Sequence, residues 1–329
     1  MIRPPMQASP SIFVSIACFM DPDVIDTVQS LYANALHPEQ VSVGICLQAG
    51  PEDRRFESLR QWPGVTVDRI DASEAKGPIY ARYRCEQLLA KESHFLQIDC
   101  HTRFFPQWDQ ILLEEFSASL ALRTKVVLSH YPINITNMDN PEHLGRIGAI
   151  TRFRHIGADA IKTHGSLITR PARPTEAFGI SAAMLFMEST AKRAIPFDPA
   201  LHYGLHAAEQ FLYSARLYTH GYRVMTPTRH SLATEYITNR ERIPLAIRKQ
   251  YNQCSAAWAE PTWSKVKYLL ELEGQEQVAE QYQEGLDACR RQYGMGRKRF
   301  LVDFYREIGI HPQLLQLFPY YRERYGHIS

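Results

Sequence analysis

The segment Gln97-Ile98-Asp99-Cys100-His101 brings a carboxylate and an imidazole together at the end of an apolar run. Side chains two residues apart on an extended chain point to the same side, so Asp99 and His101 can reach one metal ion together. Breaking a bond to a nucleoside diphosphate leaves negative charge on the leaving group, which a divalent cation stabilises. An oxygen ligand with an imidazole suits manganese or a related ion. The alternative is an aspartate that caps a turn beside a surface histidine.

Two other charged residues stand at the starts of predicted helices. Gly77-Pro78-Ile79-Tyr80-Ala81-Arg82 opens a helix just before the Asp99 strand, and a helix N-terminus with an arginine in its first turns favours anion binding. The alternative is an ordinary proline-started helix with a solvated arginine. Glu209 follows the turn Tyr203-Gly204 and can orient or accept a substrate hydroxyl. The alternative is a glutamate that the helix dipole favours in the first turn.

Alternating strand-like and helix-like patterns predict the framework that positions these residues. A β-α-β order implies an α/β fold with a mostly parallel sheet covered by helices, and ligands then bind outside the carboxyl ends of the strands. Residues 134–175 are rich in proline, glycine and arginine and are expected to be a functional loop or an irregular excursion. The expected strands are 11–19, 41–47, 65–70, 94–98, 125–129 and 178–187, and the expected helices are 23–35, 78–91 and 207–220.

The length of 329 residues allows two structural units. We expect a flexible N-terminus (1–10), a catalytic unit (11–245) and a C-terminal helical extension (246–329). The net charge of +2 argues against nucleic-acid binding. The six cysteines form no CxxC pair, so we expect them to be reduced and the compartment to be cytoplasmic. No signal-peptide pattern or apolar run of about 20 residues is found, so no transmembrane segment is expected.

Seven segments distributed through residues 11–310 resemble, in the same order, the UDP-GlcNAc:polypeptide N-acetylglucosaminyltransferase family. Members attach GlcNAc to hydroxyproline or threonine hydroxyls, and bacterial relatives have unknown acceptors. No single segment is decisive, but seven in register are hard to obtain by chance. The segments are GPIYAR, QIDCHTRF with the following WD, SHYP, FGISAAMLF, PFDPAL, EQFLYSARLYTHGY and YGMGRKRFLVDFY.

The resemblance implies a GT-A fold (a Rossmann-like glycosyltransferase fold), a UDP-sugar donor, a divalent metal and retention of anomeric configuration. Mn²⁺ or Mg²⁺ is then expected as the cofactor, with Asp99 and His101 at the family's metal-binding position. Glu209 takes the acidic position that faces the sugar and the acceptor, and with Asp99 is a catalytic candidate. The acceptor is a hydroxyl on a protein or a glycan. The expected donor-binding residues are Ser15, Ala17, Arg82, Gln97 and Asp99.

Two departures from the family pattern leave alternatives open. Gln210 stands where a second acidic residue is usual, and Thr234, two residues before Tyr236, stands where a histidine usually supplies a further metal ligand. A glycosyltransferase-like binding protein with impaired catalysis is therefore one alternative. A nucleotidyltransferase is a second, although the glycine-rich, lysine-containing loop of that class is missing near the first strand.

Overall fold

An eight-stranded sheet forms the centre of the computed structural model, which describes residues 9–155, 161–204, 207–236, 243–272, 286–311 and 316–317. The strand order is β10-β12-β6-β11-β4-β1-β2-β3. The bounds are β1 Ile12–Phe19, β2 Val41–Gln48, β3 Val65–Ile70, β4 His94–Asp99, β6 Val126–Leu128, β10 Thr175–Ala177, β11 Met184–Glu188 and β12 Arg223–Thr226.

Most neighbouring strands of this sheet are parallel, as the sequence predicted. β1 lies between β2 and β4 and is parallel to both, β2 is parallel to β3, and β12 is parallel to β6. β11 and β10 run antiparallel to their neighbours. The near-continuous apolar sequence of β1 reflects burial on both faces of the sheet.

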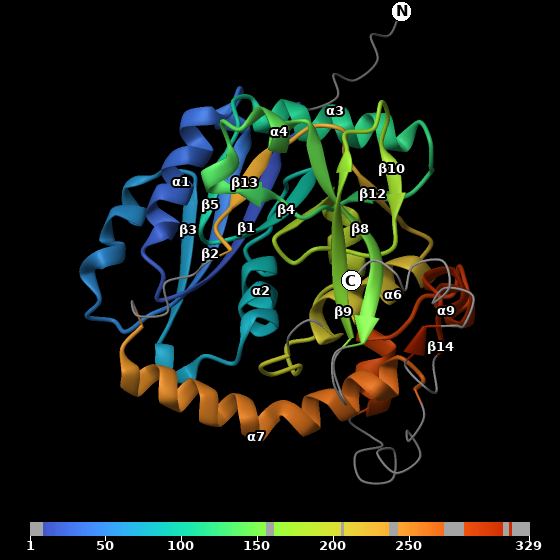
Figure 1. Ribbon diagram of the computed structural model, residues 1–329. Coiled ribbons are helices and arrows are strands. Elements are labelled where there is room, and N and C mark those ends of the chain that lie inside the picture. Colours follow the sequence, from blue (N-terminus) through green and yellow to red (C-terminus); the bar gives the residue numbers. More distant parts are fainter. Residues whose placement is uncertain are drawn as a thin grey trace, which may run out of the picture.

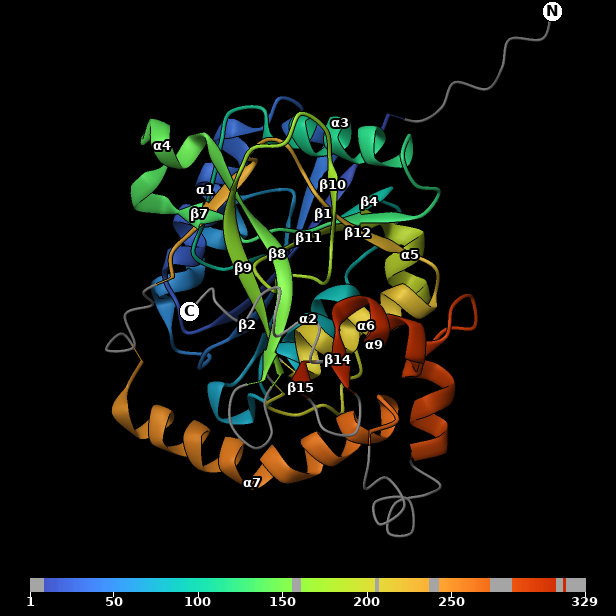
Figure 2. The same cartoon turned by 45° about the vertical axis from the view of Figure 1, so that its right-hand side comes forward.

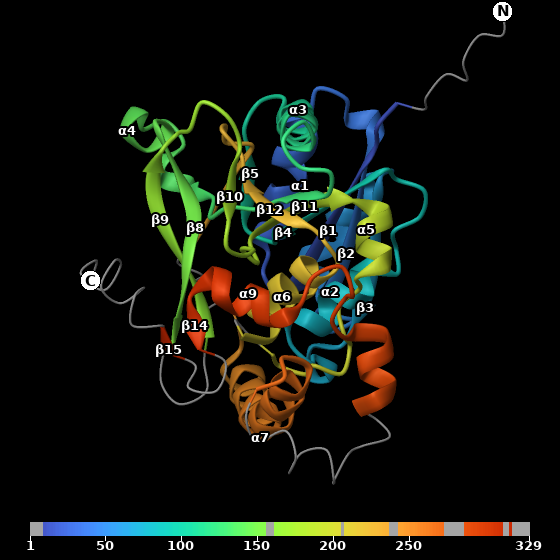
Figure 3. The ribbon, with the colours of Figure 1, turned by 90° about the vertical axis from the view of Figure 1, so that its right-hand side faces the viewer.

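Helices cover both faces of the sheet (Figure 3). Val14 and Leu96 point into a core formed with α1 (Asp23–Asn34) and α3 (Trp108–Leu120). Their neighbours Phe13 and Phe95 point the other way, into a second core, because successive strand residues alternate faces. This second core contains residues of α2 (Pro78–Glu86), α5 (Ser189–Ala194), α6 (Leu212–Thr219) and α9 (Leu301–Ile308).

The expectation of an irregular segment at 134–175 is wrong for most of its length. After β7 (Ile133–Asn134) and the short α4 (Pro141–Leu144), β8 (Arg146–His155) and β9 (Ile161–Thr169) pair as an antiparallel hairpin (Figure 2). Buried apolar residues stand at nearly alternate positions along β8, with Arg146 and Arg152 beside two of them; these buried residues are Ile147, Ala149, Ile150 and Phe153. The charged residues hid this period-two pattern, and a bulge after Ile150 interrupts it.

Two other predicted elements are shorter than expected. Helix α2 ends at Glu86, and the next three residues bond at i→i−3 spacing, which turns Leu88 and Leu89 onto the core. Residues 178–183 are not strand, because Ile180 and Ser181 donate their backbone N–H groups to the hydroxyls of Ser214 and Ser129.

The C-terminal extension begins with the long helix α7 (Leu245–Leu269), which crosses the molecule below the sheet (Figure 1). Tyr251 of α7 packs on Phe19 at the end of β1, with ring centroids 5.0 Å apart. Val266 and Leu269 enter the same core as α6, so the extension packs on the catalytic unit.

The predicted boundary near residue 245 stays a prediction, and residues 1–8 of the expected flexible N-terminus lie outside the described part. The short pair β14 (Ile310–His311) and β15 (Gln316–Leu317) interrupts the helical pattern.

Two expectations about the chain as a whole can be compared with the structure. All six cysteines are free thiols, as expected. Among the described helices, none combines the length and the apolar character that crossing a bilayer would need.

Candidate active site

The segment Asp99-Cys100-His101-Thr102 leaves the carboxyl end of β4 and is fixed from two sides. Thr27 of α1 donates its hydroxyl to the Cys100 carbonyl (2.8 Å) and accepts the N–H of Thr102 (2.9 Å). Strand β13 (Leu232–Thr234) lies on the other side and pairs with β5 (Thr102–Phe104). Just after β13, the backbone N–H of Glu235 donates to the His101 carbonyl. The two candidate metal ligands therefore stand on a rigid backbone.

Arg82 joins Asp99 to Glu209, which are distant in sequence. One guanidinium nitrogen of Arg82 is 3.3 Å from Asp99 Oδ1, and another forms an ion pair with Glu209 Oε1. Only 5% of the Arg82 and Glu209 side chains is exposed, whereas 29% of Asp99 is. Burial lowers the pKa of Arg82 and the charge of Asp99 opposes that effect. Three of the predicted residues thus form one cluster, which reaches solvent through Asp99.

The arginine is buried, in contrast to the solvated side chain that an ordinary helix start would give. Gly77 precedes Pro78 with φ of +92°, and a Cβ atom there would lie 2.6 Å from the Cα of Tyr203. Only glycine allows this close approach. The chain around Tyr203 therefore covers the start of α2, and Arg82 turns from the helix toward the two carboxylates.

Glu209 belongs to a single π-helical turn, η5 (Ala207–Phe211), which leads directly into α6. Such wide turns are rare and are found mostly at functional sites. The predicted helical start is therefore present, although its first turn is not a regular α-helix.

The remaining predicted donor-binding residues lie on β1 and β4 near Asp99 and differ in how deeply they are buried. Ala17 of β1 is in register with Asp99, and Ser15 is in register with Gln97. Gln97 is buried and donates its amide to the carbonyl of Ala182 (2.9 Å), which also accepts from Arg82 (3.1 Å). Ser15 is fully buried in the middle of β1. Ala17, half-buried and nearer the carboxyl end, is therefore better placed to meet a ligand than Ser15.

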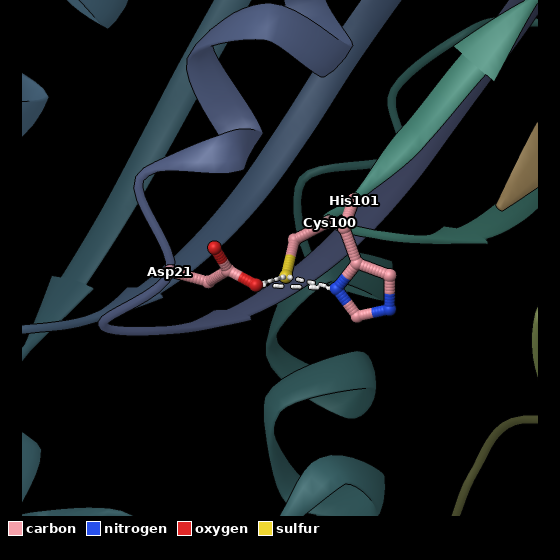
Figure 4. Close-up of side chains that lie close together, drawn as sticks. All are labelled: Asp21, Cys100 and His101. Atoms are coloured by element: carbon pink, nitrogen blue, oxygen red, sulfur yellow. Dashed lines mark hydrogen bonds and ion pairs between the residues drawn. The ribbon is translucent and has the colours of Figure 1, made fainter. Parts of the chain in front are cut away.

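His101 lies between two carboxylates, with one ring nitrogen toward each. Its Nε2 is 3.9 Å from Asp99 Oδ2, and its Nδ1 is 3.2 Å from Asp21 Oδ2. Figure 4 shows Asp21, Cys100 and His101 pointing toward one another, with the Cys100 sulfur 3.7 Å from Nδ1. Burial disfavours the imidazolium, but the hydrogen bond with Asp21 and the charge of Asp99 help to raise the pKa of His101 to about 11.

Two sets of side chains in this region have the chemistry to hold a divalent ion. The first is Asp99 with His101 Nε2, whose 3.9 Å separation is within the roughly 4.2 Å that two ligands each about 2.1 Å from one ion can span. The second is Asp21, Cys100 and His101 Nδ1, whose ligand atoms lie within 4.8 Å of one another. A hydrogen bond with Cys18 and burial raise the pKa of the Cys100 thiol well above its ordinary value, which opposes the thiolate that a metal needs. Because the pKa of His101 is also raised, a metal at either set must displace a proton from the imidazole.

Asp21 and Thr27 contact the segment of the candidate metal ligands and were not predicted from the sequence. Asp21 follows β1 just as Asp99 ends β4, so the rule that ligands bind at the carboxyl ends of parallel strands could have indicated it. The hydroxyl of Thr27 and the carbonyl of Ala182 carry no comparable signal, because their roles depend on contacts with distant segments.

The two positions that depart from the family pattern border the cluster. Thr234 donates its hydroxyl to the His101 carbonyl (3.3 Å), so it stands beside the predicted metal ligand. Gln210 accepts a hydrogen bond from Thr163 of β9. His230, four residues before Thr234, contacts Phe105, His130 and the carbonyl of Arg146.

Comparison with known families gives one match, to the family described as Glycosyltransferase (GlcNAc), over residues 11–62 and 55–314. A search of curated protein sequences gave no match.

Among solved structures, the fold is similar to the crystal structure of GalNAc-T7 with UDP, GalNAc and Mn²⁺. The TM-score is 0.58 and the identity 13%, over 91% of this chain and 57% of that one. The chain thus spans little more than half the length of this neighbour. TarS 1–349 from S. aureus gives a TM-score of 0.45 at 12% identity, covering 92% of this chain and 93% of that one.

Proposed function

The chain belongs to the GlcNAc glycosyltransferase family and has a GT-A type fold, and from this premise we propose that it moves a sugar from a UDP-sugar donor to a hydroxyl acceptor. We propose GlcNAc, or a related sugar, as the transferred group, with retention of anomeric configuration. The observation that carries the proposal is the convergence of Asp99, Arg82 and Glu209 at the carboxyl edge of the sheet.

We propose that Asp99 and His101 Nε2 hold a divalent ion, Mn²⁺ or Mg²⁺, which would neutralise charge on the diphosphate of the donor. In this assignment Asp21 accepts the Nδ1–H of His101 and orients the ring, because metal-bound histidines usually donate their second nitrogen to a carboxylate or carbonyl. Ala17 borders the nucleoside. Gln97 supports the cluster through the carbonyl of Ala182, to which both Gln97 and Arg82 donate. The GalNAc-T7 structure contains UDP, GalNAc and Mn²⁺, which is the ligand class proposed here.

In this proposal Glu209 acts on the sugar side of the cluster, and Arg82 offsets negative charge on the donor phosphates. Arg82 pairs with Asp99 and with Glu209 and so holds both carboxylates in fixed positions, with its positive charge next to both of them. Glu209 orients a sugar hydroxyl or the acceptor through a hydrogen bond. With retention, the acceptor attacks from the face of the leaving group, so an oxygen of the diphosphate takes the acceptor's proton and no protein nucleophile is needed.

A binding protein with impaired catalysis remains the second candidate, because Thr234 and Gln210 replace groups that handle metal or protons in the family pattern. UDP release from UDP-sugars separates the two candidates. Steady metal-dependent release supports the enzyme, whereas tight UDP binding without release supports the binding protein.

UDP-GlcNAc should stabilise the protein thermally when Mn²⁺ or Mg²⁺ is present, because the ion joins Asp99 and His101 to the diphosphate. At a hundredfold excess over Kd, binding to the native state adds about 2.7 kcal/mol to the free energy of unfolding. Differential scanning fluorimetry with and without EDTA measures the shift. An equal shift in EDTA would contradict the metal bridge.

Glu209→Gln should lower kcat more than it weakens UDP binding, because the carboxylate lies on the sugar side. Loss of one charged hydrogen bond made in the transition state corresponds to roughly a hundredfold lower rate. Initial rates over a range of donor concentrations, with calorimetry of UDP binding, check both quantities. Loss of UDP binding with an unchanged rate on bound donor would move Glu209 to the nucleotide end of the site.

Asp21→Asn should weaken Mn²⁺ binding by roughly tenfold to a hundredfold, which is typical for the loss of a carboxylate that orients a histidine ligand. Cys100→Ser should leave binding unchanged and is the matched control. Calorimetry with and without UDP measures both variants. A sulfur-to-cobalt charge-transfer band in the Co²⁺-loaded wild-type protein, lost in Cys100→Ser, would assign the ion to Asp21, Cys100 and His101 instead.

A further inference from the structure

A cleft of about 380 Å³ opens between the β8–β9 hairpin and the segment that contains β7. Figure 2 shows the hairpin, β7 and α4 on the same side of the molecule. The volume is within the range of small-molecule sites. The cleft is lined by Tyr131, Pro132, Ile133, Asn134, Asn137, His143, Gly148, Thr163, His164, Gly165, Ser166, Leu167 and Tyr236.

The cleft adjoins the Asp99–Arg82–Glu209 cluster at two points. Thr163, in its wall, donates to Gln210, the residue that follows Glu209. Tyr236, also in the lining, directly follows Glu235, whose backbone N–H donates to the carbonyl of His101 (3.0 Å), two residues after Asp99. A group bound in the cleft would therefore approach the proposed donor sugar.

The polar lining of this cleft consists of amides, imidazoles and hydroxyls. None of its thirteen lining residues is an aspartate, glutamate, lysine or arginine. Arg152 contacts His164 from β8, with 3.2 Å between Nη2 and Nε2, and is not part of the lining. Recognition of a phosphate or carboxylate would call for lysine or arginine in the wall. The lining therefore favours a neutral ligand.

Aromatic and apolar surface accompanies these neutral polar groups. Half of Tyr236 is exposed, as is half of Leu167. Sugars present C–H faces and hydroxyl edges, which match such a mixture of aromatic surface, amides and hydroxyls. At Gly148 the edge of β8 already accepts the N–H of Tyr131 (2.8 Å), so a peptide strand could not pair with β8 at that position.

We infer that this cleft binds the acceptor and that the acceptor is an uncharged carbohydrate; the inference rests on the proposed transferase function. In the step, the bond between the anomeric carbon and the diphosphate oxygen breaks, and UDP leaves with the electron pair. A new bond forms from that carbon to the acceptor hydroxyl oxygen. The hydroxyl proton passes to the diphosphate, so the products are UDP and the glycosylated acceptor.

Acceptor binding is tested first without turnover, in the presence of UDP and Mn²⁺. Saturation-transfer NMR compares neutral methyl glycosides with glucuronic acid, glucose 6-phosphate and peptides containing threonine or hydroxyproline. Neutral glycosides should bind in preference to the others. Preferential binding of a peptide or of a phosphorylated or acidic sugar would overturn the inference. Because this measurement needs no catalysis, it decides the chemistry of the cleft even if donor cleavage, and with it the proposed function, fails.

Asn137→Ala then tests whether the cleft is the acceptor site. Removing the amide should raise the KM for the best neutral acceptor, or its Kd, by on the order of tenfold, with donor hydrolysis in water unchanged. Asp139→Ala, an exposed position on the same segment outside the lining, is the matched control. Equal acceptor constants in the two variants would overturn the assignment. A parallel loss of donor hydrolysis in Asn137→Ala alone would also overturn it, since the amide would then serve the donor.

Discussion

Asp99→Ala is expected to lower sugar transfer at least a thousandfold, which corresponds to about 4 kcal/mol of barrier. The substitution removes the proposed oxygen ligand of the metal ion and one of the two carboxylates that Arg82 holds. Glu209 still neutralises the buried guanidinium, so the fold should survive. Transfer assays, with circular dichroism and thermal unfolding of the same samples, measure both effects.

Asp99→Asn is the control for shape, because the amide retains the size of the side chain and one oxygen. We expect it to bind Mn²⁺ more weakly and to be nearly as inactive as Asp99→Ala. Activity of either variant above a tenth of wild type would indicate that Asp99 is structural. Restoration of the rate by a high Mn²⁺ concentration in Asp99→Asn, but not in Asp99→Ala, would support its place as a ligand.

Lys192→Met is expected to lower the free energy of unfolding by about 3–5 kcal/mol, the usual cost of breaking a buried ion pair by removing one partner. Lys192 is 1% exposed, lies 2.6 Å from Glu86 Oε1 and donates to the Tyr213 hydroxyl at 2.9 Å. Burial lowers its pKa to about 8, against the opposing charge of Glu86. Urea denaturation at neutral pH measures the loss.

The double variant Glu86→Leu/Lys192→Met separates the ion pair from packing. Because both charges leave the core together, its loss of stability should be smaller than the sum of the single losses. Arg193→Met, the neighbour of Lys192 at the exposed end of the same helix, is the matched control and should change stability by less than about 0.5 kcal/mol. Additive losses in the double variant would mean that the two side chains stabilise the core independently.

The framework of the sheet could be predicted from the sequence because its strands carry local patterns. The apolar runs at 11–19, 41–47 and 94–98 became β1, β2 and β4, since strands buried on both faces need continuous apolar residues. Asp99 and His101 also lie close together, with His101 Nε2 3.9 Å from Asp99 Oδ2, but β4 ends at Asp99 and a bend, not an extended strand, carries His101. The resemblance to known sequences indicated a glycosyltransferase, and the match over residues 11–62 and 55–314 shows the GlcNAc glycosyltransferase family. The narrower family that acts on polypeptides stays a prediction.

Charged or polar segments concealed regular structure where the local pattern was ambiguous. The hairpin of β8 and β9 carries three arginines, a lysine and two histidines, and composition alone indicated a loop. Its regularity comes from pairing between strands and from Gly148 and Gly165, where a Cβ would collide with Tyr131. These contacts are long-range and leave little trace in composition.

The assembly of the site was decided by tertiary structure alone. Asp21 reaches His101 across 80 positions of sequence, and Arg82 reaches both Asp99 and Glu209 because α2 and η5 pack on the same side of the sheet. The sequence provides the residue types and the local spacing, since these depend on neighbours along the chain. Which carboxylate meets which nitrogen depends on how separate elements pack, because burial forces distant charged groups to pair with one another.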